Sequence, residues 1–134
     1  MAGIARQTQY QMPHSLRKMV TFNDAGIAAG NLVGTVPAGS IITSVIVQIA
    51  TVFNAGTTNV LTVGTTGTGT DLMTSAEAIA GTQGQKAGAA FKATTASNPL
   101  ANDTDVFVAY AQTGTAATTG VGYVIVTYHP NNDR

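Results

Sequence analysis

Cysteine and tryptophan are absent from this chain of 134 residues, and charged residues are scarce. Without cysteine, the chain has no disulfide framework, no thiolate metal site and no cysteine nucleophile. The sequence also lacks any run of about 18 apolar residues that would mark a membrane-spanning helix. Charged residues make up 9% of the chain, against about 25% in typical soluble domains. The surface must therefore be covered mainly by small and uncharged polar residues.

The few charges are unevenly distributed along the chain. The formal net charge is zero, which argues against a general nucleic-acid binder. Residues 1–18 nevertheless carry a net charge of +3 without a single acid, whereas residues 19–134 carry −3. A body with so little charge has weak electrostatic protection against association. That property suits a subunit of a larger assembly.

The first 15 residues show neither helical nor strand periodicity, so we expect an extended N-terminal arm that a partner orders. A terminus without any role is the alternative. The expected organisation is an arm over residues 1–15, one domain over 16–130 and a polar tail over 131–134. We hypothesise that basic groups in and beside the arm contact acidic or backbone groups of a neighbouring subunit or shell: Arg6, His14, Arg17 and Lys18.

Segments rich in β-branched residues alternate with glycine, proline and asparagine turn signals along the domain. One helical turn is expected over 71–79, with Asp71 or Thr74 as N-cap and Glu77 in its first turn. Residues 81–88 are expected to form a loop. The pattern predicts an all-β fold of about seven or eight short strands, either a β-sandwich or a jelly roll. The expected strands span residues 16–23, 31–36, 41–53, 59–63, 89–95, 104–113 and 121–129.

The longest expected strand, residues 41–53, has one uniformly apolar face and one mixed face. The first face is assigned to the core and comprises Ile41, Thr43, Val45, Val47, Ile49, Thr51 and Phe53. The mixed face is expected to be covered by a neighbouring subunit or its arm. Residues 31–70 contain no charge to protect a strand edge, so we expect a homodimer or homotrimer. The interface candidates on the mixed face are Ile42, Ile46 and Val52.

Residue types that can perform catalysis are present, but their patterns do not form a known site. Asp103 and Asp105 should point the same way from one strand, yet two carboxylates are too few for a calcium site. We therefore interpret them as a solvated strand edge. His129 has no G-x-S-x-G nucleophile motif to accompany it, and the glycine-rich residues 64–69 lack the Lys-Ser/Thr ending of a phosphate loop. We expect no catalytic, metal-binding or cofactor-binding residues and no enzyme activity.

Three stretches together resemble a known group of proteins. Pro37–Ile42 leads into a β-branched strand, Phe53–Gly64 forms a loop and a returning strand, and Thr119–Tyr128 forms the last strand. This pattern resembles small β-sandwich structural proteins of tailed bacteriophages, above all the capsid decoration or cement proteins. The similarity covers residues 32–64 and 104–128 and includes no catalytic residue.

The resemblance implies a virion protein that is assembled in the host cytoplasm. Such a protein would bind the outside of the capsid and bridge neighbouring major capsid proteins, with no nucleic acid or membrane as partner. Phage tail and fibre components contain similar segments and remain an alternative. A carbohydrate-binding module is an alternative of another class, but it would need aromatic side chains to stack on sugars, and only 6% of the residues are aromatic.

Overall fold

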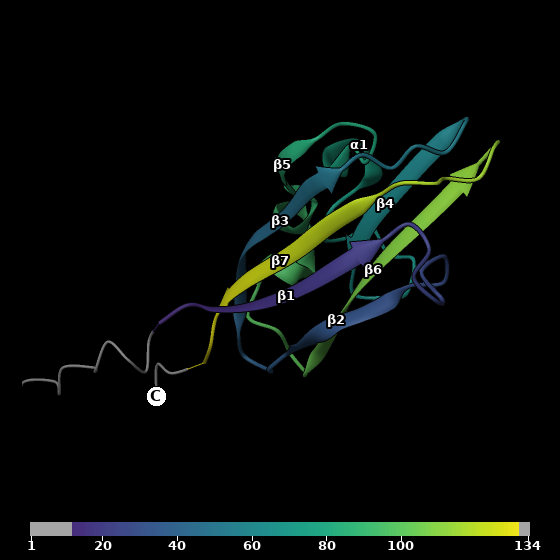
Figure 1. The fold of residues 1–134 in the computed structure, drawn as a ribbon. Coiled ribbons are helices and arrows are strands. Elements are labelled where there is room, and N and C mark those ends of the chain that lie inside the picture. Colours follow the sequence, from purple (N-terminus) through teal and green to yellow (C-terminus); the bar gives the residue numbers. More distant parts are fainter. Residues whose placement is uncertain (1–11, 132–134) are drawn as a thin grey trace, which may run out of the picture.

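Two antiparallel sheets packed face to face make up the computed structural model, which describes residues 12–131 (Figure 1). The helices of this range are short: α1 spans Ser75–Ala78, and the 3-10 helices η2 and η3 span Ala90–Ala93 and Thr95–Ser97. The all-β prediction is therefore confirmed. The strands are His14–Thr21 (β1), Asn31–Val36 (β2), Ile41–Thr51 (β3), Thr58–Gly64 (β4), Gly84–Ala87 (β5), Thr104–Thr113 (β6) and Val121–His129 (β7).

Successive strands alternate between the two sheets, so every connection crosses from one layer to the other. One sheet has the order β1-β7-β3-β5 and the other has the order β2-β6-β4. The antiparallel pairs are nested around β4, because β1 pairs with β7, β2 with β6 and β3 with β5. A long hairpin rolled up on itself has this nesting, which is the arrangement of a jelly roll. The protein is thus a β-sandwich whose strand order is that of a jelly roll.

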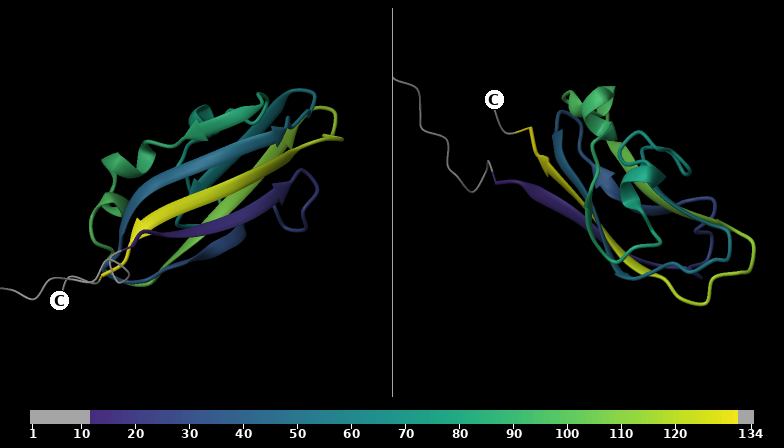
Figure 2. Two further views of the ribbon diagram at one scale, coloured as in Figure 1. Left: turned by 60° about the vertical axis from the view of Figure 1, so that its left-hand side comes forward. Right: turned by 90° about the horizontal axis from the view of Figure 1, so that it is seen from above.

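The core lies between the sheets and is built from alternating side chains of the facing strands. Val45, Val47 and Ile49 on β3 are at most 1% exposed, and Phe53 just beyond the strand is equally buried. This part of the core prediction is confirmed. Figure 2 shows the two sheets as separate layers, with the short helices near β5. The three-stranded sheet contributes its own buried set: Leu61, Val63, Val106, Val108 and Tyr110.

Irregular pairing at both ends of β3 breaks the simple alternation that the sequence suggests. The register with β7 shifts between Ile42 and Ser44 and again between Ile49 and Thr51. Such bulges change which face the side chains beyond them occupy. Ile42 is consequently 2% exposed in the core, so its prediction as an interface residue is wrong. Three residues assigned to the core are exposed for the same reason: Ile41, Thr43 and Thr51.

Two other local predictions are wrong, and several boundaries lie elsewhere: the strands expected at 16–23, 41–53 and 59–63 span 14–21, 41–51 and 58–64. β1 begins at His14, so the expected boundary between arm and domain falls inside a strand. β5 occupies residues 84–87, where a loop was predicted, because this short segment completes the edge of β3. Residues 90–93 form a 3-10 helix that buries Phe91, where a strand was predicted. The helical turn is confirmed, with Thr74 as its N-cap.

Candidate interaction surface

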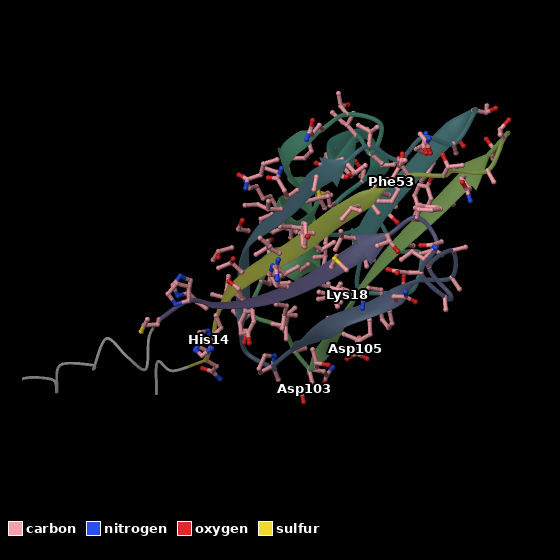
Figure 3. The ribbon with its side chains drawn as sticks, viewed as in Figure 1. His14, Lys18, Phe53, Asp103 and Asp105 are labelled. Carbon is pink, nitrogen blue, oxygen red and sulfur yellow. The ribbon has the colours of Figure 1, made fainter. Side chains whose placement is uncertain are left out.

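The described residues of the basic-arm hypothesis, His14, Arg17 and Lys18, do not form one cluster. Arg6 lies outside the described residues, whereas His14, Arg17 and Lys18 belong to β1, an edge strand of the four-stranded sheet. The His14 ring stacks on Tyr128, with ring centroids 5.8 Å apart and an angle of 24° between the planes. His14 lies at the beginning of β1, far from Phe53 at the other end of the sandwich (Figure 3). Arg17 and Lys18 are adjacent in a strand, so they point to opposite faces of the sheet.

Arg17 lies on the outer face of the four-stranded sheet, where it covers an aromatic ring. Its guanidinium carbon is 4.7 Å from the centroid of the Tyr123 ring on β7, which is a cation–π contact. Met19 is paired with Tyr123 and is 52% exposed. Arg17 is paired with Ile125, so the cation sits among apolar and aromatic side chains.

Ile46 and Val52, the remaining interface candidates, lie at different places relative to this face. Ile46 is half-buried and pairs with Ile125, so it belongs to the same outer face as Arg17. Val52 follows the end of β3 and is 36% exposed. The sequence-based prediction named no residue of β7 as part of an interaction surface, although Tyr123 and Ile125 lie on this face. The available signal was that the last strand is apolar on both faces, which suggests a cover on its outer side as well.

The two aspartates predicted to form a solvated edge are exposed, and each accepts a hydrogen bond from the segment beside β6. Asp105 accepts from the Thr35 hydroxyl at 2.7 Å, and Asp103 accepts from the backbone N–H of Ala38 at 2.8 Å. These contacts attach β2 and the turn after it to β6. Within residues 12–131, no three His, Asp or Glu side chains lie close enough together to hold a metal ion.

A hollow of about 390 Å³ lies beside Asp71, between the loop after β4 and residues 95–104. The Asp71 carboxylate accepts two hydrogen bonds from Thr65, at 2.8 Å from the backbone N–H and 2.6 Å from the hydroxyl. The carboxylate therefore stabilises the loop after β4. None of the helices in the described part of the chain has the length and apolar character needed to cross a membrane.

Glu77 connects α1 to the segment that follows β5. Its carboxylate accepts a hydrogen bond from the N–H of Thr74 at 2.8 Å and another from the N–H of Ala89 at 2.9 Å. Desolvation pushes the pKa of Glu77 upward, but the hydrogen bonds from Thr74 and Ala89 outweigh it and hold the pKa below its usual value. The ionised form of Glu77 therefore stabilises the folded state.

We expect Glu77→Gln to lower the free energy of unfolding by about 1 kcal/mol at neutral pH, because two backbone N–H groups lose a charged acceptor. A carboxyl group with a lowered pKa stabilises the fold above its unfolded pKa of about 4.3. That contribution is lost as the pH falls through the lower, folded pKa. Urea unfolding at several pH values should show a weaker acid dependence in Glu77→Gln than in the wild type. Equal acid dependence in both proteins would contradict this role.

Comparison with known proteins gives a structural likeness and no sequence family. No protein-family model matches the chain, and no curated protein matches its sequence. The fold is similar to a chain of the Cyanophage Pam1 capsid asymmetric unit, with a TM-score of 0.69 and 23% identity over 97% of this chain and 92% of that chain. It is also similar to a chain of the capsid of Ralstonia phage GP4, with a TM-score of 0.54 and 22% identity over 89% of this chain and 84% of that chain. The likeness establishes a shared fold over most of each chain.

Proposed function

We propose that this chain is a structural protein of a bacteriophage virion. In the finer form of the proposal, it is a non-enzymatic decoration or cement protein that binds the outside of the head and bridges neighbouring major capsid proteins. The observation that carries the proposal is the fold similarity, over most of both chains, to chains of two phage capsid structures. The finer form of the proposal is what the sequence pattern of residues 32–64 and 104–128 implies, which we interpret as similar to phage decoration proteins.

The described structure suits a protein that acts by binding. Side-chain hydrogen bonds join the loop after β3 to the loop before β7: Asn54 accepts from the N–H groups of Thr118 and Thr119 at 2.8 and 2.9 Å. Bonds of this kind hold the connections of the sandwich in fixed positions. Because β3 and β7 both belong to the four-stranded sheet, these bonds help to fix the strands that form its outer face.

Co-sedimentation with phage shells tests the proposal directly. Shells assembled from the major capsid protein of the same phage, but lacking this chain, should bind it saturably and carry it into the pellet. Electron microscopy of virions with a labelled chain should place the label on the head. A label on the tail would favour the tail or fibre alternative, and a failure to bind shells would contradict the decoration role.

Removing residues 1–11 should weaken shell binding about tenfold, equivalent to ~1.4 kcal/mol. This truncation removes Arg6 and leaves β1 intact, since β1 begins at His14. The circular dichroism spectrum should keep its β signal. Unchanged affinity would mean that the arm, including Arg6, has no role in attachment.

Self-association into a homodimer or homotrimer stays a prediction of the sequence. Light scattering of the purified chain at tens of micromolar should give the mass of a dimer or a trimer. A well-folded monomer under these conditions would contradict it.

A further inference from the structure

Positive and negative charges lie in different parts of the described structure. The strands of the four-stranded sheet contain Arg17, Lys18 and Lys86, together with both histidines, and no acid. The three-stranded sheet contains one acid, Asp105, and no lysine or arginine. The other described acids lie in segments outside the four-stranded sheet: Asp24, Asp71, Glu77 and Asp103.

Both free edges of the four-stranded sheet carry a lysine at a position on the inner side of the sheet. On β1, Lys18 is paired with Val124, and on β5, Lys86 is paired with Val47, and both valines are in the core. Charged residues placed inward on edge strands oppose the addition of a further strand. Binding through the edges of this sheet is therefore disfavoured, and its outer face is the better docking element.

The middle of the outer face consists of two cross-strand rows, and the four-stranded sheet lies in front in Figure 1. One row runs from Arg17 through Ile125 and Ile46, and the parallel row runs from Met19 through Tyr123 and Gln48. All six side chains are half-buried or exposed, so none of them belongs to the core. Arginine and tyrosine are the residue types enriched at the centres of interfaces, where they contribute most of the binding energy. We call this set the outer face: Arg17, Met19, Ile46, Gln48, Tyr123 and Ile125.

We propose that the outer face docks on the major capsid protein, at a surface that is apolar and presents a carboxylate to Arg17. This inference rests on the proposed function. The guanidinium is already held over the Tyr123 ring at 4.7 Å, so little conformational freedom is lost when it pairs with a carboxylate. A second copy of this chain is a poorer occupant, because a two-fold interface through this face would bury two copies of Arg17 with no acid in either outer face to pair with them. A homodimer or homotrimer has to use another surface.

Co-sedimentation of charge variants with shells of the major capsid protein tests the docking face. Arg17→Glu should weaken binding at least thirtyfold. The matched control is Lys92→Glu, which makes the same charge reversal on an exposed residue of η2, an element that contributes nothing to the outer face, and should stay within twofold of the wild type. Arg17→Lys should lose less affinity than Arg17→Glu, because the charge remains.

A second pair of variants hardly changes the size of the side chain, so that a loss of binding is not explained by misfolding. Gln48→Glu is nearly isosteric and adds a negative charge to the outer face, so it should weaken binding about tenfold or more by repelling the partner's carboxylate. Gln112→Glu makes the same change on β6, where the side-chain oxygen that accepts from the N–H of Ala117 is retained, and it should bind like the wild type.

The outcomes separate this inference from the proposed function. If the wild type binds shells and Arg17→Glu and Gln48→Glu bind equally well, the docking face is overturned and the decoration role stands. If these variants instead dissociate a homo-oligomer in solution and leave shell binding unchanged, a second copy occupies the face and the inference is wrong. If the wild type does not bind shells, both proposals fail.

Discussion

Ile49→Ala is expected to lower the free energy of unfolding by about 2–5 kcal/mol, the usual range for truncating a buried large aliphatic side chain. Ile49 is fully buried and lies near the end of β3, where β3 pairs with both β7 and β5. Alanine would leave a cavity between the sheets, and the hydrogen-bonded strands on both sides limit how far the structure can close it. Urea unfolding followed by circular dichroism measures the loss.

Ile46→Ala is the matched control, because it makes the same truncation in the same strand on the opposite face. Ile46 is half-buried at the outer face, so its truncation should cost only about 1 kcal/mol. Equal costs at the two positions would contradict the assignment of faces in β3. The same comparison also shows whether the free protein covers its outer face, since a covered Ile46 would behave like Ile49.

Gly30→Ala is expected to destabilise the fold by about 2–5 kcal/mol, from left-handed backbone strain of about 1–2 kcal/mol and overpacking of about 1–3 kcal/mol. Gly30 precedes β2 with a φ of +103°, which L side chains rarely adopt. A Cβ atom at this position would overlap the backbone carbonyl of Gly67 in the loop after β4. The obstacle is backbone rather than a flexible side chain, so one of the two loops would have to move.

Gly81→Ala provides the control for this substitution. Outside Gly81 and its two chain neighbours, no atom lies within 4 Å of the Cβ that would be added, so the change should be neutral or stabilise slightly through the unfolded state. Thermal unfolding of the two variants beside the wild type gives the comparison. A Gly30→Ala protein as stable as Gly81→Ala would mean that the two loops do not pack as described.

The sequence by itself determined the elements whose side chains alternate strongly. Strands 31–36, 104–113 and 121–129 have the predicted bounds. In 104–113 and 121–129, β-branched and aromatic residues repeat with a period of two, whereas 31–36 was predictable from the turn signal of residues 37–40 that ends it. The capped helical turn at Thr74 was predictable because its N-cap and Glu77 are neighbours in the chain. The central core residues Val45, Val47 and Ile49 followed from the same local pattern.

Only the tertiary structure decided the features that depend on pairing between distant segments. The bulge that buries Ile42 arises from the register of β3 against β7, about eighty residues later in the chain, and no local pattern encodes it. β5 lacks an apolar alternation and is a strand because the edge of β3 supplies its hydrogen-bond partners. The outer face likewise exists only because β1 and β3 both pair with β7, which brings Arg17, Ile46 and Tyr123 onto one surface. Side-chain alternation is a property of one segment, whereas register and sheet order are set by the packing of the whole chain.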